Sequence, residues 1–431
     1  MTDIRSDRSG ESRPNVVLIT AHDLGQHLGC YGVETVESPN LDTLADRGVR
    51  FENACSTTPV CSPSRGSLHT GRYPQSNGLL GLTHQPWWWR LNDGEETIPE
   101  LLGEAGYETH LAGIQHIAPH ASRLSFDHRH QTDHDAEQTA AAAPEIFESA
   151  DGPFYAQFGF QEVHRTYEQG QYDERGVYVP GYLQKTEEIV DDLARFQAEI
   201  NYLDEQVGDV LNALEESGYR EETVVLFTTE HGIPYPGAKC WCRSPGVEIA
   251  TIADGPGPAF SERETVDAVF SNVDILPTLF DVLDVPIPER VEGVSFRDYL
   301  AGETDDPPRE FAFTQYTAAG SEARGVIGRE FNLIRNFGAG RPVEYPVDTD
   351  PTDREGSTTW EPRPYAQLYD RKADPYELDD VADEHPDVVE RLSNRVRSWM
   401  VDVDDPVLRG GIRYPYNRRA VGDLLSGQAD R

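Results

Sequence analysis

The segment PVCSPSRGSLHTGRYP, from Pro59 to Pro74, contains the residues with the most evident chemistry. Cys61 stands directly before Ser-Pro-Ser-Arg, and Arg65 follows it by about one helical turn. A structural cysteine has no need of this polar and cationic context, whereas a reactive cysteine does. The other cysteines are Cys30, Cys55, Cys240 and Cys242. We expect them to be reduced thiols, because an odd total without a secretory signal argues against a disulfide framework.

Four short apolar segments predict buried strands, and each is followed by polar side chains. The strands span residues 15–20, 107–113, 154–160 and 223–229, and they lead into His22-Asp23, His116, His164 and Glu230-His231, respectively. In a doubly wound sheet, ligands bind beyond the carboxyl ends of the strands. The sequence therefore predicts one polar site at four strand ends. A further strand, over residues 49–54, leads to a loop that carries Cys61, outside the core.

The strands alternate with predicted helices, which indicates an α/β fold with a large, mostly parallel, doubly wound sheet flanked by helices. One helix starts at Ser38-Pro39, another at a capping box over Thr97–Glu100, and a long amphipathic helix covers residues 185–216. Beyond residue 300, short alternating stretches predict a smaller antiparallel sheet, followed by a helix over residues 386–399. We expect a disordered tail over residues 1–13, a main α/β domain over 14–300 and a smaller C-terminal α+β subdomain over 301–431.

The chain of 431 residues has 76 acidic and 37 basic residues, a formal net charge of −39, and only three lysines, Lys185, Lys239 and Lys372. Such an acidic surface repels nucleic acid and anionic membranes, so neither is expected as a partner. It suits molar salt, where the screening length is about 3 Å, and we expect a halophilic source. The sequence has no apolar run of roughly 18 residues and no apolar signal segment, which favours a cytoplasmic protein.

Cys61-Ser62-Pro63-Ser64-Arg65 resembles the C-x-P-S-R signature of the sulfatase family, within the alkaline-phosphatase-like superfamily. The resemblance continues through GSLHTGRYPQSNG, PNLDTLADRGVRFENA, VDILPTLFDVLDVPIPERVEGVSF and QLYDRKADPYELDDVADE, and so extends over nearly the whole chain. The segments GIPYPGAK and QEVHR are most similar to the heparan N-sulfatase (sulfamidase) branch. The resemblance implies a sulfuric ester hydrolase whose substrate is a sulfated small molecule or oligosaccharide, carrying a sulfate ester or an N-sulfate.

In sulfatases the signature cysteine is oxidised after translation to formylglycine, an aldehyde that hydrates to a geminal diol. The resemblance therefore implies that a formylglycine-generating enzyme acts on Cys61. One hydroxyl of the diol attacks the sulfate sulfur, and the second later expels sulfate and regenerates the aldehyde. An unmodified thiolate lacks the second hydroxyl and would form a stable adduct.

The resemblance also implies which residues surround Cys61. The implied catalytic residues are Cys61, Arg65, His116, His164 and Lys239, and the implied substrate-binding residues are Lys239, His164 and Gln115. The implied metal ligands are Asp23, Glu230, His231, His22 and Cys61. The resemblance implies Ca²⁺ as the divalent ion, but Ca²⁺ prefers oxygen ligands, and the two histidines leave Mn²⁺ or Zn²⁺ open.

Three positions depart from the family pattern. Most sulfatases have Asp-Asp at His22-Asp23 and Asp-Asn or Asp-His at Glu230-His231, and the family's Lys-x-His motif is Ile114-Gln115-His116 here. Two alternatives stay open, the first because related enzymes share the fold and the modified cysteine, and the second because of these departures. One is a phosphonate or phosphate ester hydrolase of the same superfamily, and the other is a catalytically impaired homologue that binds anionic glycans.

Two further segments have competing interpretations. Trp87-Trp88-Trp89-Arg90 could stack on sugars, but three consecutive aromatic residues cannot all face one way, and packing is favoured. The segment FDHRHQTDHDAEQ, Phe126–Gln138, contains three histidines and three aspartates and could bind a metal ion. Its ligands lack a regular spacing, so we expect a solvated acidic loop.

Overall fold

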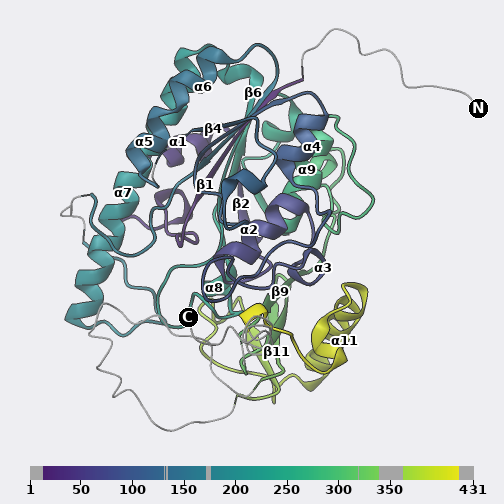
Figure 1. Ribbon diagram of the computed structural model, residues 1–431. Coiled ribbons are helices and arrows are strands. Elements are labelled where there is room, and N and C mark those ends of the chain that lie inside the picture. The colour runs from purple at the N-terminus through teal and green to yellow at the C-terminus, as the bar shows by residue number, and fades with distance from the viewer. Residues whose placement is uncertain are drawn as a thin grey trace, which may run out of the picture.

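The computed structural model describes residues 13–130, 132, 134–170, 176–318, 320–338 and 363–416, so nearly all of the predicted tail lies outside the described residues. Its main element is an eight-stranded sheet with the order β4-β3-β5-β1-β6-β7-β2-β8 (Figure 1). The strands are β1 (Asn15–Ala21), β2 (Val49–Cys55), β3 (Glu108–Gly113), β4 (His128–His130), β5 (Phe154–Gly159), β6 (Thr223–Thr229), β7 (Thr251–Asp254) and β8 (Thr265–Ser271). Among these strands only β7 is antiparallel to its neighbours, which confirms the predicted mostly parallel α/β sheet.

Helices cover both faces of this sheet, with α1, α5, α6 and α7 on one face and α2, α4 and α9 on the other (Figure 1). The α-helices are α1 (Pro39–Arg47), α2 (Cys61–Thr70), α3 (Pro74–Asn77), α4 (Ile98–Glu104), α5 (Ala136–Ala141), α6 (Ala143–Ser149), α7 (Glu187–Glu216), α8 (Ser244–Val247), α9 (Ile275–Val282) and α10 (Arg297–Leu300). The 3-10 helices are η1 (Gly29–Tyr31), η2 (Ala121–Arg123), η3 (Arg220–Glu222), η4 (Pro258–Phe260), η5 (Asn272–Asp274) and η6 (Pro406–Arg409). In β1, Val17 and Ile19 share a core with α7, whereas Val16 and Leu18 share one with α4 and α9. Apolar residues on both faces are typical of a buried parallel strand.

Two predicted helix starts differ in detail. Helix α7 begins two residues later than predicted, because the Thr186 side chain caps it. The capping box predicted at Thr97 is wrong, since that side chain makes no capping hydrogen bond to α4. A capping box forms instead at Ser271 and Asp274, where η5 leads into α9.

The C-terminal part contains the predicted antiparallel sheet, with the order β12-β11-β10-β9. Its elements are β9 (Ala312–Tyr316), β10 (Ala323–Ile327), β11 (Phe331–Asn336), β12 (Ala366–Asp370) and α11 (Pro386–Asp402). Leu392, Val396 and Trp399 of α11 share a core with Val326 and Leu333 of the sheet. The apolar stripe of α11 therefore covers one face of the small sheet.

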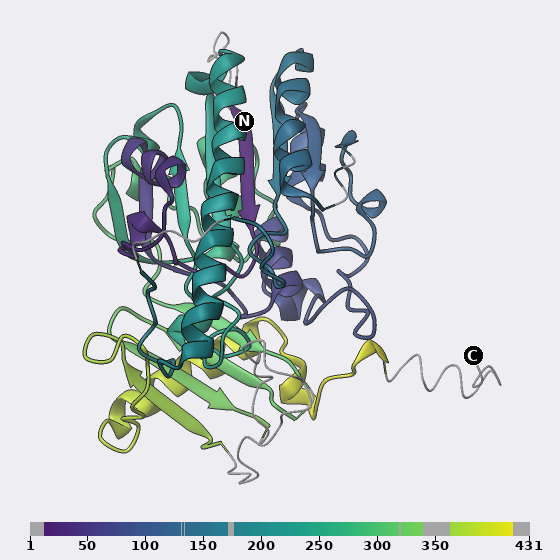
Figure 2. The same ribbon diagram turned by 90° about the vertical axis from the view of Figure 1, so that its left-hand side faces the viewer.

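The carboxyl ends of the parallel strands point toward the small sheet, as Figures 1 and 2 show. The backbone joins the two sheets at this level, because Gln315 N in β9 donates to Thr57 O, just after β2, at 2.8 Å. Cys240 N also donates to Pro59 O at 3.0 Å. The segment that leads to Cys61 is therefore enclosed between the main sheet and the small sheet.

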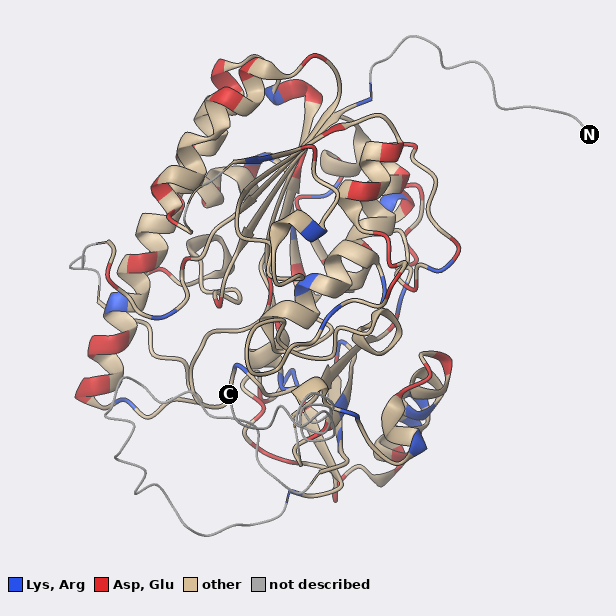
Figure 3. Ribbon diagram, viewed as in Figure 1, with Lys and Arg blue, Asp and Glu red and all other residues tan. Residues whose placement is uncertain are grey.

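Acidic side chains are spread over the helices of the main domain, whereas α11 carries several basic ones (Figure 3). The acidic residues are thus distributed over the surface and do not form a tail within the described part of the chain. In that same part, no helix combines the length and apolar character needed to cross a bilayer.

Arg324 in β10 and Asp405 after α11 form a buried ion pair that fastens α11 to the small sheet. Arg324 Nε and Nη2 donate to the two carboxylate oxygens of Asp405 at 2.5 and 3.0 Å, and both side chains are 0% exposed. Breaking a buried pair by removing one partner costs far more than losing an exposed pair.

We therefore expect Asp405→Asn to lower the free energy of unfolding by about 3–5 kcal/mol, because the Arg324 guanidinium stays buried without its counter-charge. Asp404→Asn is the matched control: this neighbouring carboxylate is 66% exposed, and its loss should cost less than about 1 kcal/mol. Urea unfolding followed by circular dichroism measures both values. Equal losses for the two variants would mean that Asp405 does not compensate Arg324.

Candidate functional site

Cys61 is the first residue of α2, not part of a loop as the sequence predicted. It is 3% exposed, and its Sγ lies 3.3 Å from His231 Nε2. The helix begins here because Val60 has extended backbone, and it ends at Gly71, whose left-handed conformation is typical of a helix C-terminus. The prediction that Cys61 lies outside the core is therefore wrong. The C-x-P-S-R segment forms the buried first turn of a helix.

The polar residues of four strand ends converge near this turn. His22 follows β1, and its ring centroid lies 5.3 Å from that of His116, after β3, and 5.5 Å from that of His164, after β5. Glu230 follows β6, and its Oε1 lies 2.5 Å from His22 Nδ1. Since β3, β5, β1 and β6 are consecutive in the sheet, the strand order brings these residues together.

Arg65 is directed at Glu230. Its Nε donates to Glu230 Oε2, and its Nη1 donates to Thr20 Oγ1 at 2.9 Å. Both charged side chains are only 2% exposed. Burial opposes the ionisation of Glu230, but Arg65 and His22 outweigh it and hold the pKa of Glu230 well below its usual range. Glu230 is therefore a buried anion that is compensated by a buried cation.

Lys239 compensates the second buried carboxylate of the site. Its Nζ donates to both carboxylate oxygens of Asp23, at 2.8 Å each, across 216 residues of sequence. Burial raises the pKa of Asp23, but Lys239 and His231 together lower it to about 2. The φ of Asp23 is 52°, in the left-handed region that residues other than glycine adopt only occasionally. The observed partner of Lys239 is thus a predicted metal ligand, and its contact with sulfate stays a prediction.

His231 lies between the two carboxylates. Its Nδ1 is 2.8 Å from the Gly232 carbonyl oxygen, which only accepts hydrogen bonds, so Nδ1 carries the proton. Its Nε2 lies 3.1 Å from Asp23 Oδ1 and 3.3 Å from Glu230 Oε1, in addition to its contact with Cys61 Sγ. Electron-rich atoms so close together repel one another unless a cation or a proton lies among them.

The same donors fit a divalent cation. One donor atom from each of His22, Asp23, Cys61 and Glu230 lies within 4.8 Å of the others. The Nε2 of His22 is buried without a hydrogen-bond partner among the described residues, whereas its Nδ1 and Glu230 Oε1 face each other at 2.5 Å. Buried polar atoms without partners are costly, and a bound cation would satisfy them. The site therefore has the donor atoms of a metal centre and a buried imidazole nitrogen that lacks a hydrogen-bond partner within the described structure.

The two other predicted histidines have different surroundings. His116 Nδ1 is buried without a partner among the described residues, and burial, reinforced by His22, lowers the pKa of His116 well below its usual range. His164 Nδ1 lies 2.8 Å from the carbonyl oxygen of Arg165, so that Nδ1 carries a proton. His116 is thus a neutral ring, and the Nδ1 of His164 is held by the Arg165 carbonyl oxygen.

Gln115 stands where the family motif has lysine, and its amide is used by its own loop. Its Nε2 donates to Ala118 O at 2.7 Å, and its Oε1 accepts from Ile117 N at 2.6 Å and from Ala118 N at 2.8 Å. These bonds fix the turn that follows β3. Substrate binding by Gln115 stays a prediction.

Three residues that the sequence analysis did not single out support the site. Ser64 Oγ donates to Glu230 O at 2.5 Å, and Asn272 Nδ2 donates to Ser64 O at 3.0 Å. His84 stacks on His116, with ring centroids 5.8 Å apart and planes at 7°. Asn272 directly follows β8, so the strand-end rule could have found it. Nothing in the sequence marks His84, because its position depends on how a loop folds back.

The sulfatase family profile matches residues 14–285. The chain belongs to the sulfatase family. This finding confirms the resemblance in the C-x-P-S-R segment and identifies the protein as a sulfuric ester hydrolase. The sulfatase is 27% identical over 462 positions to human N-sulphoglucosamine sulphohydrolase, covering 92% of this chain and 91% of that protein. It is 26% identical over 463 positions to an ulvan-active sulfatase of Formosa agariphila, covering 91% and 76%.

Solved sulfatase structures share the fold. The structure of a 2-O GAG sulfatase matches with a TM-score of 0.75 at 19% identity, covering 94% of this chain and 95% of that one. A second structure, in complex with its substrate D-glucosamine-2-N,6-O-disulfate, matches with a TM-score of 0.69 at 19% identity, covering 91% and 99%. The main sheet and the small sheet therefore belong to the common sulfatase architecture.

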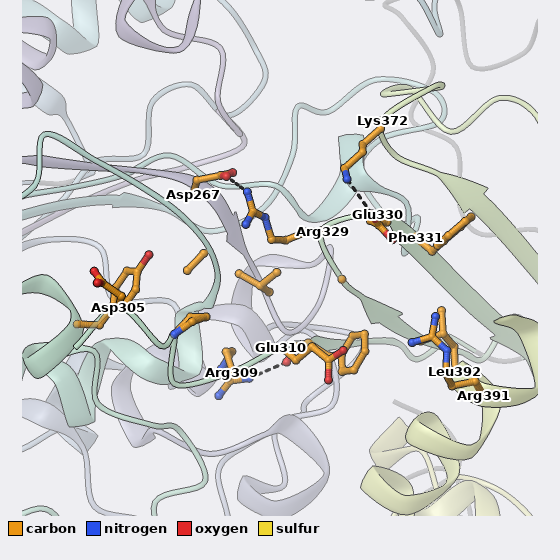
Figure 4. A pocket seen from close by; sticks show the side chains of 16 residues that line it. Asp267, Asp305, Arg309, Glu310, Arg329, Glu330, Phe331, Lys372, Arg391 and Leu392 are labelled. Atoms are coloured by element: carbon orange, nitrogen blue, oxygen red, sulfur yellow. Dashed lines mark hydrogen bonds and ion pairs between the residues drawn. The ribbon is translucent and has the colours of Figure 1, made fainter.

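A cavity of about 610 Å³ in this sulfatase lies between β8 and the small sheet (Figure 4). Arg329 pairs there with Asp267, and Lys372 Nζ lies 2.8 Å from Glu330 Oε1. None of the strand-end residues lines this cavity. Since it lacks the site residues, this cavity is not the candidate active site.

A groove of about 1050 Å³ in the sulfatase is lined in part by the two loops that carry His84 and His116. Four arginines line it against two aspartates; the arginines are Arg90, Arg123, Arg409 and Arg413. The loop with Arg90 also carries His84, which stacks on His116, and the loop with Arg123 carries His116 itself. Trp88 and Trp89 both line the groove, and Trp89 is also largely buried and packs against Tyr414. The tryptophan segment therefore both packs against the rest of the protein and forms part of the groove wall.

The Arg65–Glu230 pair of the sulfatase predicts a pH dependence that changes sign. Because the folded pKa of Glu230 is below its ordinary value of 4.5, its ionisation stabilises the fold above that pH, and this stability is lost as the pH falls. In Arg65→Met, burial should dominate and raise the pKa of Glu230. The free energy of unfolding should then drop by about 3–5 kcal/mol and should decrease further as the pH rises from about 5 to 7.

Urea unfolding in the presence of a chelator, at several pH values, measures the slope of the free energy of unfolding against pH. Arg409→Met is the matched control, because Arg409 is 71% exposed and should leave the slope of the wild-type protein unchanged. A wild-type slope in Arg65→Met would mean that Arg65 does not hold Glu230 in its ionised form.

Proposed function

We propose that this sulfatase hydrolyses sulfate esters or N-sulfates of carbohydrates through a formylglycine made from Cys61. The observation that carries the proposal is the location of Cys61, in a C-x-P-S-R helix turn beside Asp23, Glu230 and His231. Burial, reinforced by Glu230, raises the pKa of the Cys61 thiol well above its usual range. An unmodified Cys61 is therefore a neutral thiol and a poor nucleophile, which favours an oxidised side chain as the reactive group.

When bound, a divalent cation would polarise a sulfate oxygen, and formylglycine would supply the hydroxyl nucleophile. The residues that would hold the cation are His22, Asp23, residue 61, Glu230 and His231. Two carboxylates are compatible with Ca²⁺, which the family resemblance implies, whereas two imidazoles favour Mn²⁺ or Zn²⁺. Arg65 and Lys239 keep both carboxylates ionised and so keep their oxygens available to a cation.

The histidines of the site supply the proton transfers. Since His164 Nδ1 is bonded to a carbonyl oxygen, a second proton on Nε2 can pass to the leaving oxygen or nitrogen when the bond to sulfur breaks. His116, which burial keeps neutral, can accept a hydrogen bond from the nucleophile. Lys239 lies close enough to Asp23 to hold it, and a bound sulfate would offer its Nζ a second anionic partner.

The arginine-lined groove supports an anionic carbohydrate as the substrate. Arg90, Arg123 and Arg413 have no carboxylate partner within the described part of the chain, although the chain as a whole has a charge of −39. Arginine binds sulfate groups through planar, paired hydrogen bonds. The relatives named for N-sulphoglucosamine and for ulvan support the same substrate class.

Cys61→Ala and Cys61→Ser should each lower the turnover of an aryl sulfate by about 10⁴-fold or more while the protein stays folded. The matched control is Cys55→Ala, which removes a buried cysteine of the same segment outside the site and should retain activity. A Cys61→Ser variant that turns over like the wild type would exclude the formylglycine mechanism.

Peptide mass spectrometry gives an independent test. Trypsin releases the peptide Phe51–Arg65, which contains both Cys55 and Cys61. After alkylation, Cys55 should carry the alkyl group, whereas residue 61 should have the lower mass of formylglycine and no alkyl group. Alkylation of both residues in protein from the native host would favour the binding-only homologue.

The groove predicts a substrate-size effect. Each lost exposed charge contact is worth about 0.2–1 kcal/mol, so the double variant Arg123→Gln/Arg413→Gln should raise KM for a sulfated oligosaccharide by about 2- to 30-fold. KM for a small aryl sulfate, which cannot reach the groove, should stay unchanged. Arg395→Gln, on α11 outside the groove, is the matched control. An equal rise in KM for both substrates would remove the groove from substrate binding.

The phosphonate or phosphate ester alternative is tested with the same enzyme preparation. Competition between an aryl sulfate and an aryl phosphonate gives the ratio of their kcat/KM values. A higher kcat/KM for the phosphonate would mean that the same site hydrolyses phosphonate or phosphate esters and that the proposed sulfate hydrolysis is wrong.

A further inference from the structure

A second cluster of potential metal ligands lies at the edge of the main sheet, apart from the Cys61 site. Glu108, His110 and His128 each offer one donor atom, and these atoms lie within 4.8 Å of one another. β4 is the edge strand, and its pairing with β3 sets His110 directly opposite His128. Glu108 and His110 are two residues apart in β3, so both lie on the same face of the sheet.

His110 is the residue that indicates a ligand. It is 2% exposed, and its Nε2 is buried without a hydrogen-bond partner within the described structure. The nearest carboxylate atom, Glu108 Oε1, is 3.9 Å away, too far for a hydrogen bond. That same oxygen lies 2.7 Å from His128 Nε2. A buried nitrogen lone pair thus adjoins a carboxylate oxygen and a second imidazole.

The other ring nitrogen of His110 is already oriented. Its Nδ1 lies 3.3 Å from Nε2 of His130, the second histidine on the same face of β4. In metal sites the ligating histidine commonly donates its remaining N–H to an acceptor, usually an oxygen, which fixes the ring and the tautomer. Here Nε2 of His130 stands in the place of that acceptor. Burial, reinforced by His128, also lowers the pKa of His110 to about 4, so the ring is neutral and able to ligate at neutral pH.

The surrounding charges favour a cation. Arg129 lies between the two histidines of β4, but it faces the other way and donates to the backbone oxygens of Ala121 and Leu124. The negative charge of Glu145, in α6, interacts with His130 and favours positive charge on the cluster's side of the sheet. The positive charge nearest in sequence is therefore directed away from the cluster.

We propose that Glu108, His110 and His128 bind a divalent transition-metal ion of the Zn²⁺ type, with His130 holding the His110 ring. Two imidazole nitrogens and one carboxylate oxygen suit Zn²⁺, Co²⁺ or Ni²⁺ and suit Ca²⁺ poorly. The segment 126–138 is then not simply the solvated acidic loop that the sequence predicted, because its histidines at 128 and 130 form an edge strand.

The bound ion would link the edge strand β4 to β3. β4 has only three residues, and its ends are half-exposed or exposed, so strand pairing alone holds it weakly. The ion would tie β4 to β3 across the connection formed by residues 114–127, which carries Gln115 and His116. Loss of the ion should loosen this loop and the edge strand, while the buried Cys61 turn keeps its own contacts.

The test uses full-length protein stripped of metal with a chelator and titrated with Zn²⁺ against a competing indicator. His128→Gln removes a ligand that is 50% exposed and should leave the fold intact. It should bind at least one Zn²⁺ fewer than the wild type, or bind it at least tenfold more weakly. The matched control is His120→Gln, an exposed histidine outside the cluster, which should match the wild type.

Hydrogen exchange locates the ion without any activity assay, so its result does not depend on the proposed function. Zn²⁺ should slow amide exchange over residues 108–130 in the wild type and in His120→Gln, but not in His128→Gln. Ca²⁺ at the same concentration should give no protection there. Equal Zn²⁺ binding and equal protection in His128→Gln and the wild type would overturn the proposal, as would protection confined to the Cys61 site.

Discussion

Two carboxylates, Asp23 and Glu230, are buried at the ends of the adjacent strands β1 and β6, and an ionised carboxylate is stable there only beside a cation. Lys239 is that cation for Asp23, and Arg65 is that cation for Glu230. Arg65 belongs to α2, which also begins with Cys61. The Arg65–Glu230 pair therefore sets the position of the helix that begins with Cys61 against the strand that leads to Glu230.

The location of the site could be predicted because strand order in a parallel sheet brings strand ends such as Asp23 and Glu230 to one edge. Their partners could not be predicted, since a pair such as Lys239–Asp23 depends on how a loop folds back across 216 residues. The short strand β7 and the polar strand β4 also lack a recognisable strand pattern. The cluster around His110 becomes visible only when the register of β3 and β4 is known.

The departures from the sulfatase pattern are physically coupled. His22 replaces a carboxylate, and Glu230, one methylene longer than aspartate, reaches both this ring and Arg65. An aspartate at position 230 would be too short to keep both contacts without a shift of β6. Gln115 is not coupled to His22 and Glu230, because its side-chain amide forms hydrogen bonds with the backbone of its own turn. Positive charge that a lysine would bring to the substrate must then come from other residues.

The burial of Lys239 has a practical consequence for handling the protein. It is one of three lysines, it is 2% exposed, and its amine is held by Asp23. Lys185, before α7, and Lys372, after β12, are the exposed lysines. Amine-directed reagents thus meet two lysine side chains at separate points of the surface, and neither lies in the Cys61 site. A dye coupled through lysine would therefore attach at few positions, and a solid support would hold the enzyme in few orientations. Neither would modify the side chains of the Cys61 site.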